Sequence, residues 1–81
     1  MSEQLITLDQ AIATVKAVVA RKKPGEDPQV DASTRFDDLK FDSLDVAELF
    51  VGLEELVGRE LDPESGKGAE AVGDLVRLRP L

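Results

Sequence analysis

Ser43 is the residue of this sequence whose type and setting best suit chemistry. It lies between two aspartates in the segment Asp42-Ser43-Leu44-Asp45, where an apolar repeat with helical spacing begins. The chain has no histidine and no cysteine, and no obvious general base is at hand to activate the hydroxyl. The serine is therefore poorly equipped to act as the nucleophile of an enzyme, and we expect another enzyme to modify it.

The length and composition of the chain narrow the range of functions. With 81 residues, there is room for one small domain over residues 1–81. The formal net charge of −7 argues against nucleic acid or an anionic membrane as a partner. Because cysteine and histidine are absent and the acids of residues 62–66 are too few for a calcium loop, we expect no metal site. The same inventory argues against an enzyme.

The start of the chain bears on its location. Met1-Ser2-Glu3-Gln4 is not a basic leader, and no apolar run in the sequence is long enough to span a bilayer. We therefore expect a cytoplasmic protein, and Met1 favours a complete chain. We also expect a monomer.

Two long segments have the apolar spacing of amphipathic helices. The first is predicted at about 7–22, from a capping box of Thr7 and Gln10 to the stop at Pro24-Gly25. The second is predicted at 43–57, with Asp42 as its N-cap and Gly58 as its C-cap. Its expected buried face consists of Leu44, Ala47, Leu49, Phe50, Leu53, Leu56 and Val57.

The remaining segments are shorter or irregular. A long loop that includes Pro28 joins the two helices, and we expect its apolar residues Val30, Phe36, Leu39 and Phe41 to anchor it to the core. Residues 62–71 predict one loose helical turn, because Gly66 and Gly68 each weaken a helix by about 1 kcal/mol. A further short helix is predicted at 71–78. The expected fold is an all-α, small up-down helical bundle with three main helices and one short, loose helix.

The stretch FDDLKFDSLDVAEL, from Phe36 to Leu49, resembles the phosphopantetheine attachment region of acyl carrier proteins. The segment Leu61-Asp62-Pro63 also fits that family, and the resemblance covers nearly the whole chain. It implies that a phosphopantetheinyl transferase moves a 4'-phosphopantetheine arm from coenzyme A onto Ser43. The thiol of this arm would then hold an acyl group as a thioester, so the resemblance implies a carrier and not a catalyst.

The acidic residues around Ser43 have two interpretations. Between positions 37 and 55, seven acids stand against one base, Lys40, and the simplest interpretation is a solvated helix face. The resemblance implies instead that they dock on basic patches of acyltransferase, ketosynthase or acyl-ligase enzymes. The residues expected at this docking surface are Asp42, Asp45, Glu48, Glu54 and Glu55, with apolar contacts from Leu44 and Val51, although Leu44 could be core.

Some residues depart from the family pattern, and some questions stay open. The family usually has glycine where Lys40 stands, so the turn before Ser43 could differ, and the tail at 77–80 is more basic than usual. The sequence favours an acyl carrier for fatty-acid or polyketide synthesis. The alternatives are an aminoacyl or peptidyl carrier and an unmodified acidic interaction bundle. The loosely held segment 62–71 further predicts that an acyl chain enters between it and the 43–57 helix.

Overall fold

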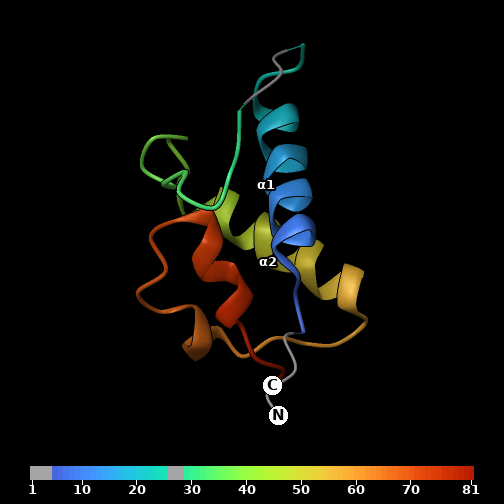
Figure 1. The fold of residues 1–81 in the computed structure, drawn as a ribbon. Helices are drawn as coiled ribbons and strands as arrows, with labels where there is room; N and C mark the ends of the chain where they lie inside the picture. Colours follow the sequence, from blue (N-terminus) through green and yellow to red (C-terminus); the bar gives the residue numbers. More distant parts are fainter. Residues whose placement is uncertain (1–4, 26–28) are drawn as a thin grey trace.

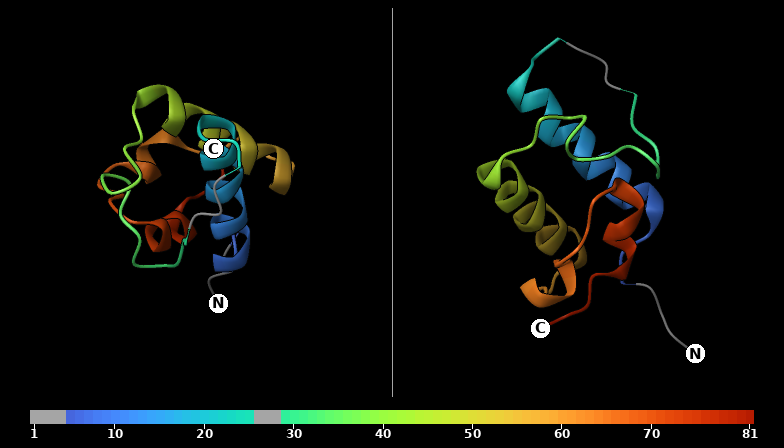
Figure 2. Two further views of the ribbon diagram at one scale, coloured as in Figure 1. Left: turned by 90° about the horizontal axis from the view of Figure 1, so that it is seen from above. Right: turned by 90° about the vertical axis from the view of Figure 1, so that its left-hand side faces the viewer.

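The structure, a computed structural model, describes residues 5–25 and 29–81. Its elements in chain order are the α-helices α1 (Leu8–Lys22) and α2 (Ser43–Val57) and the 3-10 helices η1 (Pro63–Gly66) and η2 (Val72–Arg77). Helix α1 packs against α2 and η2, and η1 packs against η2 (Figures 1 and 2). No strand occurs in the described part of the chain, so the all-helical class is confirmed there. Pro28, expected in the loop, lies outside the described residues.

Local signals at the helix ends explain why the two α-helices have the predicted bounds. The Thr7 hydroxyl accepts a hydrogen bond from the Gln10 amide at 3.1 Å, and the Gln10 side chain accepts one from the Thr7 amide at 3.0 Å. This capping box starts α1. Helix α2 ends where Gly58 takes a left-handed conformation with φ of 71°, which glycine adopts without steric cost.

One cluster of buried apolar side chains draws on α1, α2, η2 and the segments beside them. Its members are Ile6, Ala11, Val15, Val18, Val19, Leu49, Leu53, Leu61, Val72, Leu75 and Leu78. The four loop residues predicted as anchors, Val30, Phe36, Leu39 and Phe41, pack against this cluster and are partly buried, as expected. The part of the loop from Val30 to Phe41 is therefore held against the core. Among the described residues, no helix has the length and apolar character needed to cross a bilayer.

The predicted burial of α2 needs correction at Leu44, Ala47 and Leu56. All three are exposed, Leu44 to 66% and Leu56 to 50%. The inward stripe of α2 runs through Leu49 and Leu53 in steps of four residues, and Val57 continues it. At 3.6 residues per turn, a step of three from Leu53 rotates Leu56 about 60° to the other side of this stripe. The spacing alone had suggested a wider buried face than the neighbouring elements cover.

The C-terminal third is helical but contains no third α-helix. The helix expected at 71–78 is the 3-10 helix η2, and the loose turn expected at 62–71 is η1. A four-residue piece such as η1 commonly adopts this tighter winding, whereas a six-residue run such as η2 is less common. The start of η2 is tied to the loop before α2, since the Val72 and Gly73 amides donate to the carbonyls of Thr34 and Ala32, both at 2.9 Å. A side chain at Gly73 would place a Cβ only 2.9 Å from that Ala32 oxygen, so the close approach requires glycine.

Candidate functional site

Ser43 is the first residue of α2, and its side chain is exposed. The residues on either side of it form a capping box. The Asp45 amide donates to the Asp42 carboxylate at 2.9 Å, and the Asp42 amide donates to the Asp45 carboxylate at 3.0 Å. This reciprocal pair fixes where the helix begins. Ser43 consequently stands at the positive end of the helix dipole, beside first-turn amides that suit a phosphate group.

The other described serines use their hydroxyls to hold the fold. The Ser33 hydroxyl donates to the Asp31 carboxylate at 2.7 Å. The Ser65 hydroxyl donates to the Asp62 carbonyl at 2.6 Å and accepts from the Arg79 amide at 3.0 Å. The hydroxyl of Ser43 makes no hydrogen bond to any residue of 5–25 or 29–81. Ser2 lies outside the described residues. Ser43 thus presents the most available hydroxyl of the described serines.

An open, mainly apolar hollow of about 430 Å³ adjoins Ser43 between α2 and η1. It is lined by Ser43, Val46, Ala47, Phe50, Pro63, Gly66 and Lys67. A Cβ at Gly66 would lie 3.0 Å from the edge of the Phe50 ring, so glycine leaves room for this ring. The sequence predicted that residues 62–71 are loosely held, but it did not indicate that Lys67 lines a hollow beside Ser43. That position depends on the tertiary fold.

The turn before Ser43 keeps a left-handed backbone at Lys40, whose φ is 57°. This conformation is unusual for a residue with a side chain and natural for glycine. The carbonyl of Lys40 accepts a hydrogen bond from Lys22 Nζ at 2.9 Å. The lysine was expected to change this turn, but it adopts a backbone conformation that glycine takes more readily than lysine.

Asp45 faces inward, and only 5% of the residue is exposed. Its carboxylate lies 2.6 Å from Lys22 Nζ, at the end of α1. The hydrogen bond from Lys22, followed by the one from the Asp42 amide, lowers the pKa of Asp45 below its ordinary value and outweighs the opposing effect of desolvation. The negative charge of Asp45 is thus compensated inside the fold.

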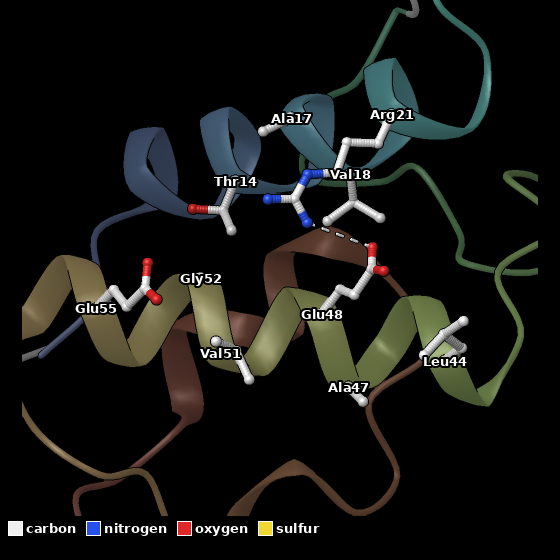
Figure 3. A pocket seen from close by; sticks show the side chains of 10 residues that line it. All are labelled: Thr14, Ala17, Val18, Arg21, Leu44, Ala47, Glu48, Val51, Gly52 and Glu55. Carbon is white, nitrogen blue, oxygen red and sulfur yellow. Dashed lines mark ion pairs between the residues drawn. The ribbon is translucent and has the colours of Figure 1, made fainter.

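A groove of about 350 Å³ separates the exposed sides of α1 and α2, and Figure 3 shows the side chains that line it. On α2 it includes Leu44 and Val51, which are 66% and 52% exposed. Glu48 reaches across the groove to Arg21 of α1, with 3.7 Å between the charged atoms. Glu55 lies farther along the same side of α2 and is exposed.

The residues expected to dock on partners therefore occupy different surroundings. Asp42, Leu44, Val51 and Glu55 are exposed, Glu48 is partly buried beside Arg21, and Asp45 is paired with Lys22. Glu54 is also partly buried, and its carboxylate accepts a hydrogen bond from the Leu61 amide at 2.8 Å. No group of three or more metal-ligating side chains gathers within the described ranges.

Comparisons with known proteins bear on the family of this chain. Residues 10–78 match the family described as phosphopantetheine attachment site. Proteins named acyl carrier protein from Clostridium perfringens strains SM101 and 13 are each 41% identical to this chain over 63 residues. These alignments cover 76% of this chain and 83% of each relative. No solved structure gives a significant match.

Proposed function

Because the chain belongs to the acyl carrier protein family, we propose that it is a freestanding carrier whose acyl intermediates ride on an arm attached at Ser43. As a member of this family, it carries a covalently bound 4'-phosphopantetheine. The observation that supports Ser43 most directly is its exposed hydroxyl at the capped start of α2. The other described serine hydroxyls are engaged in hydrogen bonds.

The surroundings of Ser43 fit such a group. The first turn of α2 offers an electropositive end for a phosphodiester, and the adjoining hollow offers an apolar surface for an uncharged chain. When bound, the arm supplies a thiol that holds the acyl group as a thioester, a chemistry that this cysteine-free chain lacks by itself. The residues of the chain present the hydroxyl and keep its flanks in place, so we propose a substrate carrier and not a catalyst.

Acyl carrier proteins work with phosphopantetheinyl transferases and biosynthetic enzymes. For this chain, we propose that acyltransferase, ketosynthase or acyl-ligase enzymes of fatty-acid or polyketide synthesis, acting in the cytoplasm, receive or deliver the acyl group. The proposed docking surface consists of the exposed residues Asp42, Leu44, Val51 and Glu55 together with Glu48. Acidic groups at its rim would steer basic partners and increase the association rate while allowing quick release. We leave out Asp45, which is buried and paired with Lys22, and Glu54, which is partly buried and holds the Leu61 amide. The Asp42 carboxylate also makes an internal hydrogen bond, but the residue is exposed and stays in the surface.

The test is intact mass spectrometry after incubation with coenzyme A and a broad-specificity phosphopantetheinyl transferase. We expect the native protein to gain one phosphopantetheine and Ser43→Ala to gain none. Ser65→Ala is the matched control and should be modified as the native protein is. Modification that persists in Ser43→Ala would refute the site, and a folded native protein that gains nothing would favour an unmodified interaction bundle.

A further inference from the structure

We propose that Lys22, the last residue of α1, is a positioning residue that holds Ser43 in the orientation required for loading. This inference rests on the proposed function of Ser43. Lys22 lies 21 positions before the serine in the sequence. The structure nevertheless brings its ammonium group to both sides of the serine, on the turn before it and on the first helical turn after it.

The contacts of Lys22 surround the segment that carries Ser43. Its Nζ donates to the Lys40 carbonyl at 2.9 Å and to the Asp45 carboxylate at 2.6 Å. The same Nζ lies 5.6 Å from the centre of the Phe41 ring, within the range of a cation–π contact. Phe41 in turn stacks on Phe36, with 5.9 Å between the ring centres. One ammonium group thus contacts residues 40, 41 and 45.

The position of Asp45 depends on this ammonium group. The Asp45 oxygen that Lys22 contacts, Oδ2, is also the oxygen that accepts the hydrogen bond from the Asp42 amide. The Asp45 side chain is only 8% exposed, whereas that of Lys22 is 29% exposed. Without the lysine, a nearly buried carboxylate would lose its counter-charge, and turning toward water would release the Asp42 amide. The capping box on both sides of Ser43 would then open.

The conformation of the turn before Ser43 also depends on Lys22. Lys40 holds a left-handed backbone, and the Lys22 bond to its carbonyl fixes the direction of that peptide group. In arm transfer the Ser43 hydroxyl loses its proton and attacks the pantetheine-bearing phosphorus of coenzyme A, and the pyrophosphate bond breaks to release adenosine 3',5'-bisphosphate. Such an attack is sensitive to small displacements of the hydroxyl. We therefore expect Lys22 to affect the rate of arm transfer more than the affinity of docking, because Glu48, Val51 and Glu55 of the docking surface lie farther along α2.

The experiment compares Lys22→Met with Lys23→Met in the full-length protein. Each substitution removes one positive charge at the end of α1, but the Lys23 side chain makes no ion pair or hydrogen bond within residues 5–25 and 29–81. Methionine also keeps the unbranched stem of lysine. A third variant, Val72→Ala, lowers stability through the buried core of η2 and leaves the contacts around Ser43 intact. The readouts are kcat and KM of a phosphopantetheinyl transferase for each carrier, and hydrogen exchange of the Asp42 amide.

We expect Lys22→Met to lower kcat roughly tenfold with little change in KM, since slight misplacement of a reacting group can cost this much. We also expect its Asp42 amide to lose protection from exchange. Lys23→Met and Val72→Ala should retain the native kcat and protection at this amide. The proposal is overturned if Lys22→Met matches either control, or if only one of kcat and Asp42 protection changes. If the native protein takes up no arm, the proposed function fails, and the exchange measurement still tests whether Lys22 holds the turn.

Discussion

Replacing Lys40 by glycine should stabilise the protein, although it removes a side chain next to the modification site. Lys40 has a φ of 57°, and its side chain is exposed. Relief of the left-handed conformation is worth about 1–2 kcal/mol. Glycine loses more conformational freedom on folding, which costs about 0.5–1 kcal/mol. The difference predicts a gain in the free energy of unfolding on the order of 0.5–1 kcal/mol.

The substitution leaves the Lys40 carbonyl in place, so its hydrogen bond from Lys22 should persist. For a domain of this size, the gain corresponds to a rise in melting temperature of about 2–8 °C, measurable by circular dichroism. Lys40→Ala is the control, because it removes the same charge but keeps the Cβ that makes the left-handed backbone unfavourable. If Lys40→Gly is no more stable than Lys40→Ala, then this backbone carries no such strain and the reasoning is refuted.

Three further predictions concern charge and cargo. The folded state lowers the pKa of Asp45, so the ionised carboxylate stabilises the fold. This stabilisation is fully present at a pH above the ordinary aspartate pKa of about 3.9, and it is lost as the pH falls through the lower pKa of the folded state. The gap in melting temperature between the native protein and Asp45→Asn should therefore narrow in acid, and a constant gap would contradict it. Replacing Glu48 and Glu55 by lysine should slow the loading of the acyl group by a basic partner enzyme, and the difference from the native protein should grow as the salt concentration falls. If both proteins are loaded at the same rate across a salt series, electrostatic docking is contradicted. An octanoyl group on the arm should raise the melting temperature of the native protein by entering the hollow beside Ser43. Gly66→Ala should show no such rise, because its new methyl group crowds Phe50 beside the hollow. If the native protein shows no rise, the octanoyl group stays in solvent.

The sequence predicts best where a structure is decided by neighbouring residues. Helix α2 has the predicted bounds because Asp42 and Asp45 cap its start and Gly58 closes its end, all within the helix or one residue beyond it. The loop anchors were predictable for a related reason. Val30, Phe36, Leu39 and Phe41 are the large apolar residues of a mainly polar segment, and their partial burial compensates for the entropy lost in ordering it.

The features that sequence reasoning missed depend on residues far apart in the chain. Lys22 pairs with Asp45 across 23 positions, and a lysine near the end of a helix is adequately explained by the helix dipole alone. The exposure of Leu56 depends on where the neighbouring elements stop covering α2. The 3-10 winding of η2 accompanies its bonds to the loop at Ala32 and Thr34. Neither spacing nor propensity contains this information.

Internal contacts of the acidic side chains of α2 reduce the number of charges that this helix offers to a partner. Of the acids on α2, Asp45 is paired with Lys22, Glu48 reaches Arg21 and Glu54 holds the Leu61 amide, which leaves Glu55 exposed. The ion pair of Glu48 is long and partly solvated, so a partner's base can replace Arg21 at little cost. The exposed residues Leu44 and Val51 then add apolar area that a partner can bury. A surface with few free charges and a small apolar patch favours weak, short-lived complexes, which is the property that a carrier visiting several enzymes requires.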